Sequence, residues 1–288
     1  MLTRDRLFAL NYLLLLVNAM ATFVGEAVAL RGAAGALLSL FDISAIVWLA
    51  IIACLALLWN SGSAAVIVRR DWVYTAIMAC IAIVPFPALS AVFLVAAGLW
   101  GYFSSAMGSP ARRAAVILIS LSAFFFWGRL FLALGAGPML AADSQFLSWV
   151  SGLSVSGNIV TAADGSTFVI APGCSSLHSI SLALILWTTT VAWFAKALNA
   201  KLFAVLGLTI IASIIVNALR LRLIGWYPQD FDYWHIGDGA AMIGWLALIV
   251  MTAIIYFGFK YDFVENSLWF APLLVISMTL KLWGINVP

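Results

Sequence analysis

The amino-acid sequence predicts an all-α polytopic membrane protein, a bundle of about eight to nine transmembrane helices with a small extracytoplasmic β-hairpin. Of its 288 residues, 65% are hydrophobic and 9% are charged. A soluble domain carries about 25% charged residues. The 14 Lys and Arg with 11 Asp and Glu therefore cannot cover a water-exposed surface of this size. Apolar stretches of about 20 residues, the length that crosses a bilayer, recur along the chain.

Nine apolar stretches are candidate membrane spans. They cover residues 8–29, 43–59, 73–86, 88–103, 114–134, 177–194, 202–224, 237–257 and 267–282. The third and fourth are short and flank Pro85-Phe86-Pro87, whose two prolines interrupt a helix. We expect a tight hairpin between two spans there, or one re-entrant unit, which would lower the number of spans to about eight.

Basic residues indicate which side of the membrane each loop occupies, because cytoplasmic loops are enriched in Lys and Arg. With a cytoplasmic N-terminus, the inner loops hold Arg4, Arg6, Arg69, Arg70, Arg112, Arg113, Lys196, Lys201 and Lys260. The exceptions are Arg31 and the pair Arg220 and Arg222. We therefore predict a multi-pass protein of the cell inner membrane, with the candidate site described below on the extracytoplasmic side.

The segment 135–173 has no Lys or Arg and is predicted to lie outside the membrane. Residues 151–170 mix apolar residues with Ser, Thr and Asn around an Asp164-Gly165 turn, which indicates a small β-hairpin. No repeat or long linker divides the chain, so we expect one membrane domain over residues 1–288. Its parts would be N-terminal spans in 1–134, the extracytoplasmic segment 135–173, site-bearing helices in 174–258 and a last span in 259–288.

Cys174 is the candidate nucleophile. Residues 171–177 read APGCSSL and join the polar segment to an apolar stretch. A cysteine at the water-exposed start of a membrane helix meets the positive end of the helix dipole, which favours the thiolate. Ser175 and Ser176 are expected to cap this helix. Cys54 and Cys80 lie inside apolar runs, where buried, inert thiols are expected.

Arg220 and His235 are expected at the same membrane face. Arginine within a membrane helix is costly, about 2.5–3.5 kcal/mol on insertion scales, so a functional role is the default interpretation. Asn217 precedes Arg220 by three residues, on the same helix face. His235 can act as acid and base near neutral pH, and Asp232 or Asp238 could orient it.

Three further residues have open roles. His178 follows Cys174 by four residues and is a rival partner for its thiol. Glu26 and Arg129 are expected at similar depth near the outer membrane face and could pair across the bundle, although Arg129 could instead bind an anionic substrate group. Two histidines and no CxxC motif indicate no metal site, and the scattered basic residues indicate no nucleic-acid partner.

In combination, the Cys174-Ser175-Ser176 string, the Asn217-x-x-Arg220 pair and His235 before a helix start resemble the exosortase/archaeosortase family of membrane cysteine transpeptidases. The motif resemblance covers about residues 155–257. It implies that Cys174 is the nucleophile and that Arg220 and His235 are essential, with Asn217 in support. One departure is Ser176, where the family usually has glycine; a side chain there would narrow the approach to the thiol.

The resemblance also implies substrates and partners. These would be secreted proteins with a C-terminal sorting tail (a short motif such as Pro-Glu-Pro, a transmembrane helix and a basic cluster), membrane lipid, and a lipid or glycan acceptor. No cofactor is expected. A transporter and a non-catalytic cell-envelope assembly protein remain alternatives; a transporter would show charges in mid-membrane and paired broken helices in both halves.

Overall fold

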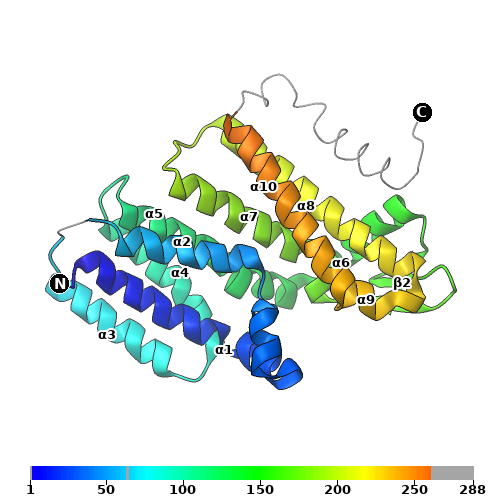
Figure 1. Cartoon of the computed structure of the whole chain (residues 1–288), viewed down its shortest axis with the longest axis horizontal. Coiled ribbons are helices and arrows are strands. Elements are labelled where there is room, and N and C mark those ends of the chain that lie inside the picture. Colours follow the sequence, from blue (N-terminus) through cyan, green and yellow to red (C-terminus); the bar gives the residue numbers. More distant parts are fainter. Residues whose placement is uncertain (1, 63–64, 261–288) are drawn as a thin grey trace. The chain divides into compact units, whose positions relative to one another are not determined.

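The computed structural model describes residues 2–62 and 65–260, and it divides the chain into two compact units (Figure 1). The first unit comprises residues up to 130 together with 188–197, and the second comprises 131–187 and the residues from 198 onward. The last expected span, 267–282, lies outside the described residues.

The first unit is built from five helices: α1 (Arg4–Leu38), α2 (Ala45–Trp59), α3 (Arg69–Ile83), α4 (Pro87–Ser104) and α5 (Pro110–Ser122). Helix α1 packs against α2, α3 and α4, and α5 packs against α2 and α4. Sequence signals set several of the helix starts. The Thr3 and Ser109 side chains accept hydrogen bonds from first-turn amides of α1 and α5, and Pro87 occupies the first position of α4. The expected break at Pro85-Phe86-Pro87 is confirmed, since α3 ends at Ile83.

A buried ion pair joins the start of α1 to the start of α3 in this unit. Arg4 Nε donates to both oxygens of Asp71 at 3.0 Å, and Arg4 Nη1 donates to the Ser104 carbonyl. Asp71 is fully buried and also accepts the Val68 amide. The two charges face each other, which lowers the cost of burying them, while Arg4 Nη2 is buried without a hydrogen bond to a described residue.

The second unit contains most of α6 (Gly128–Ser151) and α7 (Ser176–Trp193), together with α8 (Ala200–Trp226), α9 (Phe231–His235) and α10 (Asp238–Lys260). Helices α8 and α10 run side by side, and the short α9 connects them (Figure 1). Two short 3₁₀ turns, η3 (Pro172–Cys174) and η4 (Pro228–Asp230), precede α7 and α9. The chain therefore reverses direction at η4 and α9, close to the end of α8.

A three-stranded antiparallel sheet replaces the simple hairpin that the sequence predicted. Its strands are β1 (Val155–Ser156), β2 (Ile159–Thr161) and β3 (Thr167–Val169), in the order β1-β2-β3. The expected turn at Asp164-Gly165 joins β2 and β3. The turn is tied to α8, since the Ala163 amide donates to the Gly225 carbonyl. A side chain on Gly225 would collide with Leu153, so glycine permits this close approach.

The segment 135–173, predicted from its lack of Lys and Arg to lie outside the membrane, is helical up to Ser151. A π-helical turn, η2 (Ala123–Trp127), joins α5 to α6, and the apolar helical stretch runs from Pro110 to Ser151. Only the residues that follow form the sheet. The sequence of 114–134 does not indicate this continuation. The helical stretch is kinked at Gly135, whose backbone angles are not helical, and it resumes through Pro138.

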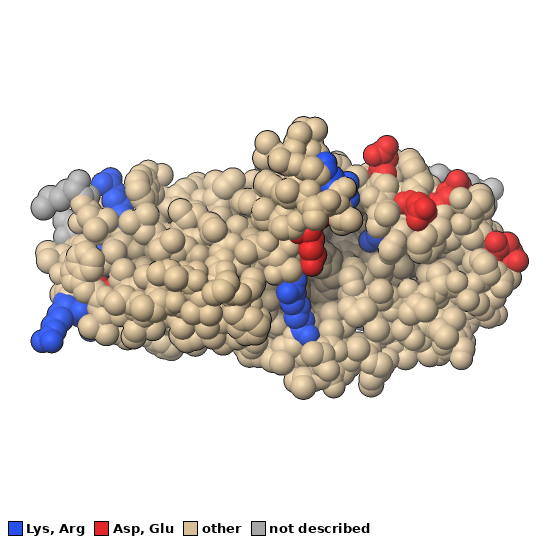
Figure 2. Space-filling view, turned by 90° about the horizontal axis from the view of Figure 1, so that it is seen from below, with Lys and Arg blue, Asp and Glu red and all other residues tan. Residues whose placement is uncertain are grey.

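Length and composition allow six helical stretches of the described chain to cross a membrane, and a seventh, α2, is apolar but shorter. The face of the protein shown in Figure 2 is mostly uncharged, with few Lys, Arg, Asp or Glu side chains. The protein is therefore an all-α, multi-pass membrane protein. The expected 73–86 span is a 15-residue helix that begins with Arg69, Arg70 and Asp71 and falls short of the length needed.

Two expectations about the first unit are not met. Glu26 and Arg129 form no ion pair within the described residues; the Arg129 guanidinium instead lies 4.6 Å from the centre of the Phe23 ring. Cys80 is exposed on α3, whereas Cys54 is buried as expected and contacts the Ala114 carbonyl. Apolar neighbours in sequence do not distinguish a helix face that meets lipid from one that meets protein.

Candidate active site

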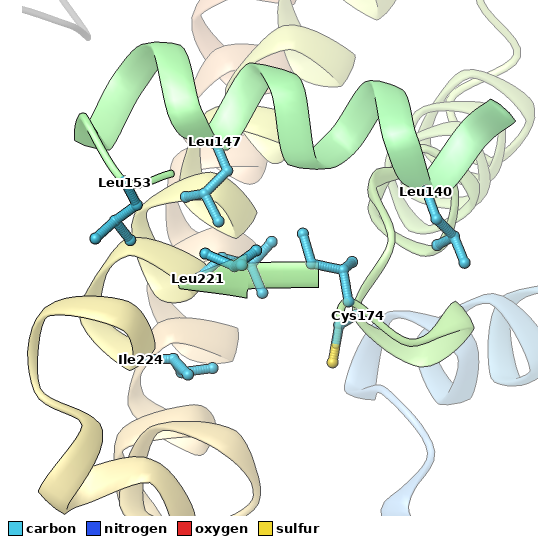
Figure 3. Close-up of a cluster of buried hydrophobic side chains, with 8 residues drawn as sticks. Leu140, Leu147, Leu153, Cys174, Leu221 and Ile224 are labelled. Atoms are coloured by element: carbon cyan, nitrogen blue, oxygen red, sulfur yellow. The ribbon is translucent and has the colours of Figure 1, made fainter. Parts of the chain in front are cut away.

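Cys174 is the last residue of η3 and lies at one edge of the buried apolar cluster of the second unit (Figure 3). The cluster also contains Leu140 and Leu147 of α6, Leu153, Val160 of β2, Ile170, and Leu221 and Ile224 of α8. Only 7% of Cys174 is exposed, so the expectation of a water-exposed thiol is wrong. Pro172 starts the tight turn, and the Cys174 amide donates back to the Ala171 carbonyl, which fixes the turn.

His235 is the side chain that meets the thiol. The distance from Cys174 Sγ to His235 Nε2 is 3.5 Å, although the two residues are 61 positions apart in the chain. His235 ends α9, and its ring lies 4.8 Å from the ring of Phe231, one turn earlier. The packing against Phe231 restricts the imidazole, so the contact with sulfur has a defined geometry.

Arg220 holds the segment that carries His235. From the last part of α8, its Nε donates to the Trp234 carbonyl at 3.1 Å, and its Nη2 donates to the His235 carbonyl. The two carbonyls lie at the C-terminal end of α9, where positive charge is favourable. Because the guanidinium is planar and rigid, two such bonds fix the orientation of the α9 end relative to α8. The Nη1 group is not used in these bonds.

Asn217 holds the turn that carries Cys174. Its Nδ2 donates to the Cys174 carbonyl at 2.9 Å. Asn217 and Arg220 are three residues apart and share one face of α8, as the sequence predicted. One helix face therefore fixes the backbone on both sides of the thiol–imidazole contact.

Asp143 is the site residue that sequence reasoning missed. Its carboxylate on α6 accepts the Ser176 amide at 3.0 Å and the Ser176 hydroxyl. Ser176 is the first residue of α7, so the cap comes from a side chain 33 residues earlier. The expected capping role of Ser175 is not seen, because its hydroxyl donates to the Pro172 carbonyl. The one sequence feature that could have pointed to Asp143 is that it is an acidic residue in a segment without Lys or Arg.

The remaining expected residues lie outside these contacts. Asp238 is the exposed first residue of α10, and no described contact joins it to His235. Asp232, the other proposed orienting group, is the acidic residue whose charge acts on His235. His178 lies on the first turn of α7, but the imidazole at the Cys174 sulfur is that of His235.

Electrostatics favour a neutral resting pair. Burial raises the pKa of the Cys174 thiol, and the positive charge of Arg220 only partly opposes this. Burial, followed by the Arg220 charge, lowers the pKa of His235, while Asp232 acts in the opposite direction. Burial therefore opposes the thiolate that a helix start favours, and both shifts favour a protonated thiol beside a neutral imidazole.

This arrangement can perform nucleophilic chemistry on a carbonyl. A protonated thiol beside a neutral imidazole forms a nucleophile–base pair when the ring proton is on Nδ1, which leaves Nε2 as the acceptor. A cation nearby stabilises negative charge that develops on sulfur or on a carbonyl oxygen. Among the described residues, no cluster of His, Cys, Asp or Glu has the geometry of a metal site.

Comparison with known proteins identifies the class. The family model described as transmembrane exosortase (Exosortase_EpsH) matches residues 41–256. This match covers most of the chain and includes the whole site, so the protein belongs to the transmembrane exosortase family. The searches of curated proteins and of solved structures gave no match. The family is generally one of membrane proteases or transpeptidases.

Proposed function

We propose that the protein is a membrane-embedded cysteine protease and transpeptidase that removes C-terminal sorting tails from secreted proteins. The observation that carries the proposal is the 3.5 Å contact of Cys174 Sγ with His235 Nε2, held by Arg220 on the backbone of α9. The site lies where the sheet meets the first turn of α7, a candidate membrane span. A substrate held in the bilayer by its own helix would present its motif at this level.

The reaction begins with proton transfer. His235 Nε2 takes the thiol proton as Cys174 Sγ bonds to the substrate carbonyl carbon, which gives a tetrahedral oxyanion and an imidazolium. The Arg220 charge stabilises the oxyanion. The C–N bond then breaks, and the imidazolium gives its proton to the leaving amine of the tail. The amino-terminal part of the substrate remains as a thioester on Cys174.

The second half returns the enzyme to its resting state. An amine or hydroxyl of a lipid or glycan acceptor, or water, gives a proton to His235 as it attacks the thioester. The sulfur leaves as a thiolate and regains the proton from the imidazolium. Transfer and hydrolysis use the same groups and differ only in the incoming nucleophile. The site would face the extracytoplasmic side of the inner membrane, where secreted substrates arrive.

The test is replacement of single residues in the source cell. Cys174→Ala is expected to leave a tail-bearing secreted protein unprocessed, and His235→Ala and Arg220→Ala are expected to give the same block. His178→Ala is the matched control, because it replaces the other histidine near the site and should leave processing intact. Normal loss of the tail in the Cys174→Ala strain would refute the proposal that the protein is a cysteine protease.

A non-catalytic assembly protein or a transporter predicts a different result. In either case Cys174→Ala would leave processing unchanged, and any defect would appear in export or assembly. Three polar contacts support the enzyme over these alternatives: His235 meets the Cys174 sulfur, Asn217 binds the Cys174 carbonyl, and Arg220 binds the backbone next to His235.

A further inference from the structure

The free edge of the three-stranded sheet runs directly into the nucleophile turn. In the order β1-β2-β3, β3 has a neighbour on one side only. Its last residue, Val169, is followed by Ile170 and then by the turn that ends at Cys174. A strand with an unpaired edge is a template for a further strand.

The hydrogen-bond pattern shows which peptide groups face outward. The Ala162 amide donates to the Ser166 carbonyl, and the Ile170 amide donates to the Asn158 carbonyl. With Val160 opposite Phe168 in the register, the groups of Phe168 face β2. Because bonding alternates along an antiparallel pair, the N–H and C=O groups of Thr167 and Val169 point away from β2.

The residues that carry these outward groups are exposed. Thr167 is exposed, and Val169 keeps 58% of its surface exposed. Residues 165–173 carry no charge, and the strand itself contains no proline, so this edge lacks two of the common devices that prevent pairing. Of the two edge strands, β1 and β3, only β3 leads directly into the turn that carries Cys174.

The edge is also joined to the thiol by packing. Val160 of β2, Ile170 and Cys174 belong to the same buried cluster, and the first two are fully buried. The hairpin turn is tied to the end of α8 through the Gly225 carbonyl. A peptide bound along β3 would therefore have a fixed position relative to Cys174.

Resting on the proposed function, we propose that the β3 edge is the docking strand for the substrate. An extended peptide, the segment on the amino-terminal side of the scissile bond, pairs by its main chain with Thr167 and Val169. The carboxyl-terminal side leads to the substrate's membrane helix and so lies toward the bilayer. From Val169 to Cys174 the chain spans at most about 17 Å, so pairing falls within about five residues of the scissile bond.

This docking mode is strand addition, in which main-chain hydrogen bonds give affinity and every second side chain of the peptide faces the same side. It predicts tolerance for many side chains in the paired segment, but a requirement for its backbone N–H groups. Each lost main-chain hydrogen bond should slow processing about threefold to tenfold.

The test removes one outward N–H group without adding bulk to the site. Val169→Pro and Thr167→Pro each delete an outward donor, at positions where an edge strand tolerates proline. The matched controls are Val169→Thr and Thr167→Val, which keep the donor and a β-branched side chain. The readouts are the pulse-chase rate of tail removal in the source cell and, on purified protein, the rate of Cys174 alkylation by N-ethylmaleimide in a Cys80→Ser background.

Slower processing in both proline variants, with alkylation within twofold of the controls, is the expected result. Processing within twofold of the controls in both would overturn the docking strand while leaving the proposed function intact if Cys174→Ala still blocks. Normal processing in Cys174→Ala would overturn both proposals.

A changed alkylation rate would show that proline has altered the fold. In that case a second measurement tests whether the substrate binds along β3. A benzophenone amino acid at position 167 or 169 of the Cys174→Ala chain should cross-link to the uncleaved substrate on illumination. The same group at Asp164, an exposed residue of the hairpin turn, is the control and should give no adduct. No adduct from either strand position would overturn the docking strand.

Discussion

Replacing Asp143 by alanine should slow catalysis without unfolding the protein, because Asp143 fixes the backbone next to the nucleophile. Its carboxylate accepts two hydrogen bonds from Ser176, which follows Cys174 by two residues. Loss of a helix cap costs about 0.5–2 kcal/mol, and a hydrogen bond to a charged group contributes about 1.5–3 kcal/mol. Asp143 is half-buried, so water replaces part of this.

We therefore expect Asp143→Ala to cost about 1–2 kcal/mol in the order of the nucleophile turn. If that order is needed at the transition state, the rate of tail removal falls about fivefold to thirtyfold. Asp143→Asn keeps an acceptor oxygen and loses the charge, so its loss should be smaller. The assay is the pulse-chase rate of processing, with thermal unfolding of the purified protein as the measure of folding.

A variant that combines Asp143→Ala with Ser176→Gly tests whether the two residues act as one pair. Ser176→Gly removes the hydroxyl bond to Asp143 but keeps the amide bond. If the two residues act as one pair, Ser176→Gly should have little further effect in the Asp143→Ala background. Fully additive effects on the rate, or an Asp143→Ala rate within twofold of wild type, would refute the role assigned to this carboxylate.

Four further outcomes are expected, three at the candidate site and one in the first unit. The rate of Cys174 alkylation by iodoacetamide should keep rising above the ordinary pKa of a thiol, since burial raises the pKa of Cys174, and a plateau near neutral pH would contradict this. Processing should fall on the acid side only below pH about 6.5, because the pKa of His235 is lowered and its base form persists to lower pH; a fall centred above that value would contradict it. Asn217→Ala should slow processing about fivefold through the freed Cys174 carbonyl, with unchanged thermal stability, whereas Asn217→Asp, which lacks the donor, should slow it at least as much. In the first unit, Asp71→Ala should cost about 3–5 kcal/mol by leaving the Arg4 charge buried and unpaired, visible as a lower unfolding temperature, and an unchanged temperature would refute the importance of this pair.

The candidate site residues could be picked out from the sequence because each lies at a boundary. Cys174 stands where a polar segment ends, and Arg220 and His235 lie near the ends of an apolar stretch and of the following loop. Helix spacing alone placed Asn217 on the face of Arg220. The structure brings these residues together in the second unit, with Arg220 on the backbone of the histidine segment.

The supporting groups could not be predicted because they depend on tertiary contacts. Asp143 caps a helix that begins 33 residues later, and no local pattern reports such a contact. The protonation state of Cys174 is a similar case. A helix start lowers a thiol pKa, but burial in a cluster of Leu, Val and Ile raises it, and only the fold shows that burial prevails. The strand β1 is two residues long and carries no pattern of its own.

The most direct test of the central claim is to detect the acyl group on Cys174. Purified enzyme would be mixed with a tail-bearing substrate, quenched in acid and digested, and the peptide carrying Cys174 analysed by mass spectrometry. We predict an adduct whose mass equals the amino-terminal part of the substrate, which neutral hydroxylamine removes and which His235→Ala fails to accumulate. Tail removal that proceeds with Cys174 unmodified at every time point, or with the acyl group on another residue, would contradict the account.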